Sequence, residues 1–319
     1  MKVVFQKFKK EVFIMITLLT LIAGAELVSS VVNAQTLDAL VNMDIHNFFY
    51  KAICLVVIFA FYLLFTYMLI RYQAYFNQKV ATWLRDRISH SIEATTYGRF
   101  YEKNSQTYIS WFTSDLEQIK GNAINPTFEV IGGIISATIS AVALFMYHWS
   151  IVVLAAICIV IMAVLPALFS AELTYKTIKV SEANEKFAKS ISDLLSGYDT
   201  LFVFRKLAYL KDKIHEKSVE VGDTHRDYSK TMAKVAVSGG IGNVFSQISV
   251  FILTGYLAYI GEVSIGSILA SMALSSTIFN VLGNISQKIG SIKSADALFD
   301  KYEQLEPASL VEEVPDEAP

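Results

Sequence analysis

A lone carboxylate interrupts the first long apolar stretch of this sequence. Glu26 has no charged neighbour between Glu11 and Asp38. In lipid such a group is costly, so it should face a cavity or a partner. It could bind a cationic substrate or a proton; alternatively, it is neutral and hydrogen-bonded to another helix, or lies near a water-filled cleft without a role.

Neutral polar side chains recur at helical spacing in the last apolar stretch. Ser276, Asn280, Asn284 and Gln287 fall within roughly an 80° arc of one helix face. Asn243, Ser246 and Gln247 form a similar patch in the preceding stretch. Such side chains could line a translocation pathway, or they could hydrogen-bond between membrane helices.

Other reactive residue types show no pattern that would do chemistry. Cys54 and Cys158 both lie in apolar stretches, where small buried side chains are the favoured interpretation over a disulfide or a metal pair. The five histidines have no metal-ligand spacing. We therefore expect no catalytic residue, no metal and no cofactor on this chain.

The elements that carry these polar groups are predicted to be membrane spans. Hydrophobic residues make up 54% of the 319 positions and charged residues only 18%, which is too apolar for a soluble protein of this size. Six segments approach the ~20 apolar residues that a helix needs to cross a bilayer. They are residues 13–34, 52–70, 130–147, 151–168, 237–260 and 265–282.

Basic residues indicate how these spans are oriented. All but one of the 27 Lys and Arg residues lie at the termini and in the two long loops, and Lys51 alone lies on the other side. This bias predicts that both termini and both loops are cytosolic. A cleavable signal ending near Ala34 is the alternative, but a spanning helix explains the length of the apolar run and Glu26 better.

Both long loops are predicted to be helical extensions of the spans. Apolar residues recur at three-to-four spacing from Phe76 to Ile88, and again from Leu173 to Leu194. Gly98 and Gly197 are expected to end the descending helices and to permit short crosswise segments. Exposed aromatic residues are expected at both tips, although an ordinary helix-to-helix turn is a simpler interpretation of each.

Four short segments, in this order and at these distances from six spans, resemble the transmembrane domain of ABC exporters. They are residues 101–105 (YEKNS), 113–119 (TSDLEQI), 194–200 (LLSGYDT) and 294–299 (SADALF). The chain departs from the family pattern at Thr107 and Trp111, where Gly and Arg are frequent, and at Ala297, where Arg is frequent. The resemblance implies an all-α membrane domain over residues 1–304.

The resemblance also implies partners and roles. The hairpin tips, at about residues 99–106 and 195–201, would be coupling helices that dock into nucleotide-binding domains. The residues implied are Phe100, Tyr101, Glu102, Ser196, Gly197, Tyr198 and Asp199. A second transmembrane half, identical or related, would complete the pathway for a small-molecule, lipid or peptide substrate, in a plasma membrane and without nucleic acid. Because the family places the last two spans at the cavity, we favour the pathway interpretation of their polar stripes.

The sequence lacks the phosphate-binding motif of an ATPase. No G-x-x-x-x-G-K-[ST] string occurs, and Tyr198 and Asp199 break an ABC signature after Ser196 and Gly197. ATP and Mg²⁺ would therefore bind a partner domain. Residues 305–319 are expected to be an acidic linker toward that domain, whether separate or fused. The alternative from a different class is a regulatory or immunity subunit that has no ATPase and binds a partner through its hairpins. A secondary transporter is disfavoured, because its long cytosolic hairpins would have no partner domain to act on.

Overall fold

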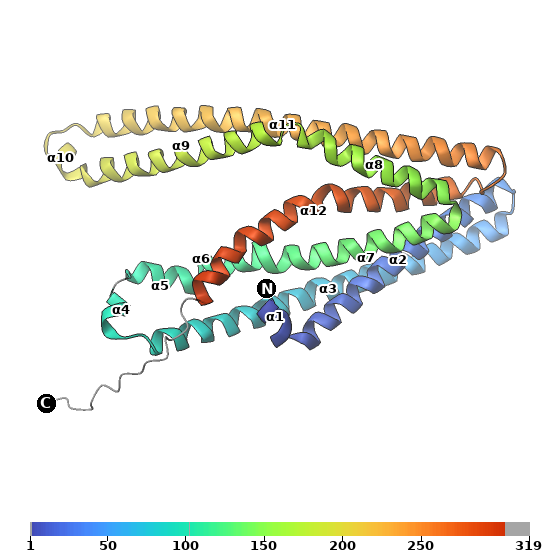
Figure 1. The fold of residues 1–319 in the computed structure, drawn as a ribbon, viewed down its shortest axis with the longest axis horizontal. Helices are drawn as coiled ribbons and strands as arrows, with labels where there is room; N and C mark the ends of the chain where they lie inside the picture. Colours follow the sequence, from blue (N-terminus) through green and yellow to red (C-terminus); the bar gives the residue numbers. More distant parts are fainter. Residues whose placement is uncertain (1, 102, 304–319) are drawn as a thin grey trace. The chain divides into compact units, whose positions relative to one another are not determined.

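The described part of the chain is helical throughout, apart from short turns. The computed structural model describes residues 2–101 and 103–303, which contain helices and turns but no strand. The helices are α1 (Lys2–Lys7), α2 (Lys9–Val41), α3 (Ile45–Glu93), α4 (Tyr97–Tyr101), α5 (Ser105–Phe112), α6 (Ser114–Ile119), the π-helix η1 (Lys120–Ile124), α7 (Asn125–Tyr147), α8 (Trp149–Ala167), α9 (Ser170–Ser196), α10 (Tyr198–Val203), α11 (Leu207–Tyr259) and α12 (Ser267–Glu303) (Figure 1).

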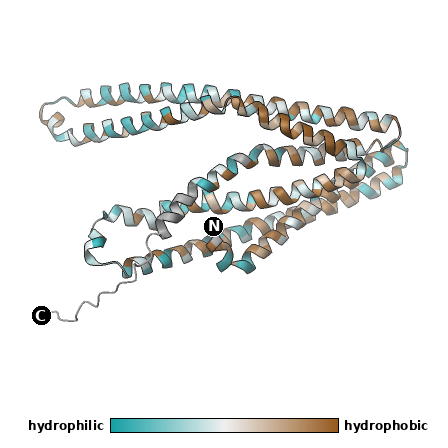
Figure 2. Cartoon of the chain, viewed as in Figure 1, coloured by the Kyte–Doolittle hydropathy of each residue, from teal (hydrophilic) through white to brown (hydrophobic). Residues whose placement is uncertain are grey.

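Six of these helical stretches within the described residues are long and apolar enough to cross a membrane. They comprise Lys9–Val41, Ile45–Glu93, Ser105–Tyr147, Trp149–Ala167, Leu207–Tyr259 and Ser267–Ser294. The predicted number of spans is thereby confirmed, and Figure 2 shows the apolar residues concentrated along them. The predicted acidic linker, residues 305–319, lies outside the described residues.

The chain divides into two compact units. One consists of the residues up to Val152 together with those from Phe251 onward, and the other of Val153–Val250. The first unit therefore holds α1 to α7 and α12. The second holds most of α8, α9, α10 and the longer part of α11.

The first unit is built on the antiparallel hairpin of α2 and α3. A turn at residues 42–44 joins them, in which Met43 has a φ of 57° and the Asp44 side chain accepts a hydrogen bond from the Asn47 N–H at 3.0 Å. Both helices run past the predicted spans toward this turn. With 49 residues, α3 is about 73 Å long, so it extends well beyond a ~30 Å hydrocarbon core.

An aromatic core joins the N-terminus to the base of this hairpin. The Phe76 ring lies edge-on to Phe8 and Phe128, with ring centres 6.0 and 5.4 Å apart. Val4 and Trp111 are each 1% exposed in the same cluster. Contacts of this kind hold α1 and the α5–α7 segment against α3, on the side of the molecule where the long extensions begin.

Two prolines lie at helix boundaries. Pro126 occupies the first turn of α7, directly after the π-helix η1, where its missing N–H costs little. Pro166 lies one residue before the end of α8, and α9 starts again at Ser170. Both prolines thus mark where an apolar span meets a polar extension.

The second unit contains a long polar hairpin of α9 and α11. Thr231 on α11 donates a hydrogen bond to the Glu172 carboxylate on α9 at 2.9 Å, and Lys234 reaches the same oxygen at 3.2 Å. Farther along, His225 lies 3.3 Å from the Asn184 side chain. These cross-links fix the two helices antiparallel, as the sequence predicts.

Candidate functional site

The tip of the first hairpin carries two exposed tyrosines on a fixed aromatic base. Tyr97 and Tyr101 are 81% and 67% exposed, and their ring centres lie 4.7 Å apart. Behind them, Phe100 stacks on Tyr108 at 4.7 Å, and the Tyr108 hydroxyl donates to the Phe100 carbonyl at 3.1 Å. Phe100 therefore holds the tip together, whereas the tyrosines face outward.

The boundaries predicted for this tip are wrong by several residues. Helix α3 ends at Glu93 rather than at Gly98, and the short segment is α4, Tyr97–Tyr101, rather than residues 99–106. After Glu93 the turn tightens, because the Thr95 N–H donates to the Ile92 carbonyl at 3.0 Å rather than to a carbonyl four residues earlier. Gly98 lies inside α4 with open space around it, and Glu102 lies outside the described residues.

The tip of the second hairpin is more apolar. Gly197 ends α9 as predicted, but the crosswise segment is α10, Tyr198–Val203, rather than residues 195–201. Tyr198 is 43% exposed and stacks on Phe202, with ring centres 6.1 Å apart. Ser196 and Asp199 are exposed beside it.

Sequence reasoning missed the strongest apolar feature of this tip. Phe202, Val203 and Phe204 are 61%, 74% and 70% exposed. The turn after them closes through Arg205, at a φ of 53°, and a 2.8 Å bond from the Lys206 N–H to the Leu201 carbonyl. An apolar triplet directly after a helix break and far from any span is the signal that could have found them.

Glu26 lies half-buried in the apolar part of α2. The hydroxyls of Ser29 and Ser30 donate to its backbone carbonyl at 2.8 and 3.0 Å, not to its carboxylate. Within the described residues, no hydrogen bond or ion pair to that carboxylate is found. The carboxylate therefore remains available to a proton, a cation or a group outside the first unit.

The polar stripe on α12 faces away from the core of its unit. Asn280, Asn284 and Gln287 are exposed, and Ser276 is partly so. The Asn280 amide donates to Ser276 at 3.2 Å, and the Asn284 amide donates to the Asn280 carbonyl at 2.9 Å. These bonds run along one helix, so the side chains do not join α12 to another helix of the first unit.

The patch on α11 belongs to the second unit. Gln247 donates to the Asn243 side chain at 2.6 Å, and both are partly buried. Ser246 is fully buried, and its hydroxyl donates to the Gly242 carbonyl at 2.7 Å. Ser246 is therefore a packing residue of its own helix in this conformation, whereas Asn243 and Gln247 keep partly open side chains.

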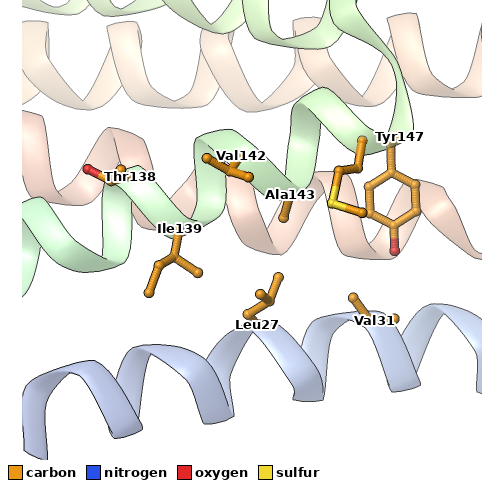
Figure 3. Close-up of a pocket in the computed structure, with 8 residues that line it drawn as sticks. Leu27, Val31, Thr138, Ile139, Val142, Ala143 and Tyr147 are labelled. Atoms are coloured by element: carbon orange, nitrogen blue, oxygen red, sulfur yellow. The ribbon is translucent and has the colours of Figure 1, made fainter. Parts of the chain in front are cut away.

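A separate apolar cavity of about 590 Å³ lies between α2 and α7 (Figure 3). The α2 side contributes Leu27 and Val31; the α7 side contributes Thr138, Ile139, Val142, Ala143, Met146 and Tyr147. The Thr138 hydroxyl already donates a hydrogen bond to the Ile134 carbonyl of its own helix at 2.7 Å. Such a lining can hold alkyl or aromatic groups by burial but offers few directed hydrogen bonds.

An ion pair joins α7 and α12 at one end of the polar stripe. The Lys288 ammonium contacts the Glu129 carboxylate, one turn along α12 from Asn284. About two turns before Lys288 along α12, the same two helices approach closely: a Cβ on Gly133 would lie 2.9 Å from the Val281 side chain. The described residues contain no cluster of His, Cys, Asp and Glu that could hold a metal ion.

Comparison with known families assigns this architecture. The model of the family described as the ABC transporter transmembrane region matches residues 12–282. The chain belongs to this family. Among the curated proteins searched, none matches the chain.

The family assignment fixes the coarse role of the described helices. This ABC transporter transmembrane region is a multi-pass membrane domain that forms a translocation path and is not itself catalytic. Such domains generally pair with an ATPase domain and with a second transmembrane half.

Proposed function

We propose that the chain is the permease half of an ATP-driven exporter, whose hairpin tips α4 and α10 receive the motion of nucleotide-binding domains. The observation that supports this most directly is the exposed aromatic surface at each tip, far from the apolar spans. Exposed aromatic side chains are the residues that fill pockets at protein interfaces. ATP and Mg²⁺ would bind the partner domains, and both termini would be cytosolic.

The long extensions suit this transmission. Helix α9 is tied to α11 by Glu172 and Thr231, and α3 is packed against α5 and α6 through Trp111 and its neighbours. A cross-linked hairpin moves as a unit, so force applied at a tip reaches the spans. Closure of the ATP-bound partner domains would then shift the population between inward-open and outward-open states.

The polar stripe and Glu26 supply the proposed path. Asn280, Asn284 and Gln287 expose polar groups on a face of α12 that its own unit leaves open, and the Glu26 carboxylate of the same unit has no partner among its described residues. Polar surface of this kind is favourable only next to water, substrate or another helix. A second transmembrane half would close the path on the open side.

Substitution of the tip aromatics tests the proposal. In the complete transporter reconstituted in vesicles, Tyr101→Ala and Tyr198→Ala should each separate ATP hydrolysis from transport while membrane insertion stays normal. Tyr175→Ala, which removes a similarly exposed tyrosine away from the tips, should leave coupling intact. Full coupling in both tip variants would contradict the proposal, and co-purification with a partner lacking ATPase activity would favour a regulatory subunit.

A further inference from the structure

Two polar cross-links bracket the apolar part of the α2–α3 hairpin. At one end the Lys79 ammonium contacts the Glu11 carboxylate, and at the other Lys51 donates to the Gln35 side chain at 2.7 Å. Along α2 these cross-links are separated by about 36 Å. That distance exceeds the ~30 Å hydrocarbon core and stays within the 40–45 Å that include the headgroups. We therefore expect each cross-link to lie in a headgroup region when the chain is inserted in a bilayer.

A pocket of about 380 Å³ opens beside the Glu11–Lys79 contact. Lys7 and Phe8 form one wall, and Tyr75, Lys79 and Trp83 of α3 form the other. Phe8 is held at the base by edge-on contacts with Phe76 and Trp83, at 6.0 and 5.8 Å between ring centres. The pocket thus has an aromatic floor that is fixed by the core of the first unit.

Cationic donors surround this aromatic floor. The Lys79 nitrogen lies 5.7 Å from the centre of the Phe8 ring and 5.9 Å from that of Tyr75. An ammonium group has three donors, and Glu11 takes up part of this capacity, so Lys79 can still donate to a second anion. Lys7 is exposed and has no acidic partner among the described residues.

The charge around the pocket is positive on balance. Lys9 and Lys10 are exposed next to Lys7, whereas the acidic groups nearby are Glu11, already paired, and Asp86. Asp86 itself lines the pocket, about two turns from Lys79 along α3 and on the side away from the spans, so the phosphate is expected at the opposite end, next to Lys7 and Lys79. A cluster of lysines at the edge of the hydrocarbon attracts anionic lipid, by roughly fivefold in affinity for each lysine.

We propose that this pocket binds the headgroup of an anionic phospholipid, in the leaflet from which the long helical extensions emerge. The phosphate would lie between the Lys7 and Lys79 ammonium groups, and the C–H groups of the headgroup glycerol against the Tyr75 and Trp83 rings. The acyl chains would continue along α2 past Phe13, which is 71% exposed. The site goes beyond the proposed transport function, because it requires only that the chain is inserted in a bilayer.

Tryptophan fluorescence can report this site directly. The chain has three tryptophans, so the Trp111→Phe, Trp149→Phe variant leaves Trp83 as the single fluorophore. In phosphatidylcholine vesicles, brominated phosphatidylglycerol should quench Trp83 several-fold more than brominated phosphatidylcholine at the same mole fraction. Equal quenching by the two lipids would overturn the proposal.

Removal of charge provides the matched test. Lys7→Gln with Lys10→Gln should lower the affinity for phosphatidylglycerol by about fivefold for each lysine that faces the lipid. Lys206→Gln with Lys211→Gln removes the same charge beside the second hairpin tip and should change nothing. Native mass spectrometry of lipids retained by the chain with its own three tryptophans gives a second readout, in case Trp111→Phe disturbs folding. Retention unaffected by the Lys7 and Lys10 changes would refute the site.

Discussion

The Asp38 carboxylate at the end of α2 accepts a hydrogen bond from the backbone N–H of Gly266, at the start of α12, over 2.6 Å. The two residues are 228 positions apart in sequence. The contact brings α12 so close to α2 that a Cβ on Gly266 would lie 1.9 Å from the Ala34 carbonyl oxygen. This end of the first unit is therefore joined through backbone contact, which only glycine permits.

Gly266→Ala should destabilise the first unit by about 1–3 kcal/mol or more, because α12 must move away from α2 to make room for the methyl group. Thermal unfolding in detergent measures this loss. Gly24→Ala is the matched control, since nothing lies within 4 Å of that position and alanine favours a helix. An unfolding temperature equal in the two variants would contradict the close approach of α12 to α2 at Gly266.

Glu129 and Lys288 should behave as a pair that links α7 to α12. Because both side chains are partly exposed, the contact should contribute about 0.2–1 kcal/mol. Glu129→Lys or Lys288→Glu alone should lower thermal stability, and the double exchange should restore most of it. A double-mutant cycle measures the coupling. If the double exchange is as unstable as the sum of the single changes, the pair makes no contribution.

Glu26→Gln tests whether the carboxylate in α2 is used in transport. Because no partner for it is found among the described residues of the first unit, we expect transport of cationic substrates, or the pH dependence of transport, to change while the protein still inserts and folds. Thr20→Ala, six residues away on the same helix, is the control. The functional interpretation fails if every substrate and the pH profile remain as in the unaltered protein.

The Glu172 carboxylate should make the second hairpin sensitive to acid. Hydrogen bonds from Thr231, and then from Lys234, hold the pKa of Glu172 below its usual value of 4.5. The stabilisation is therefore fully present above about pH 4.5 and is lost as the pH falls through the lowered pKa. Hydrogen exchange of α9 should be faster in Glu172→Gln than in the unaltered protein at neutral pH, and this difference should shrink in acid.

Glu185→Gln provides the comparison for this experiment. Glu185 is exposed on the same helix, and no contact joins its side chain to α11 among the described residues. Its substitution should leave exchange in α9 unchanged at every pH. If the exchange rates of Glu172→Gln and of the unaltered protein differ by the same amount down to the lowest pH, the charge of the Glu172 carboxylate does not contribute to holding α9 against α11.

Much of the architecture could be predicted from the sequence because it depends on properties of residues that are neighbours along the chain. Transfer free energies add along a contiguous stretch, so six spans and two helical extensions follow from composition and spacing alone. Gly197 ends α9 as expected, because a glycine that follows a helical pattern is a local signal for the end of a helix.

Only the tertiary structure decided which side chains meet and which stay open. The Glu11–Lys79 and Asp38–Gly266 contacts join distant residues, and no local pattern specifies such pairs. The end of α3 at Glu93 and the exposure of Phe202 to Phe204 likewise became visible only in the folded chain. Hydropathy determines that a helix crosses the membrane, whereas the neighbours of that helix determine which of its faces can bind anything.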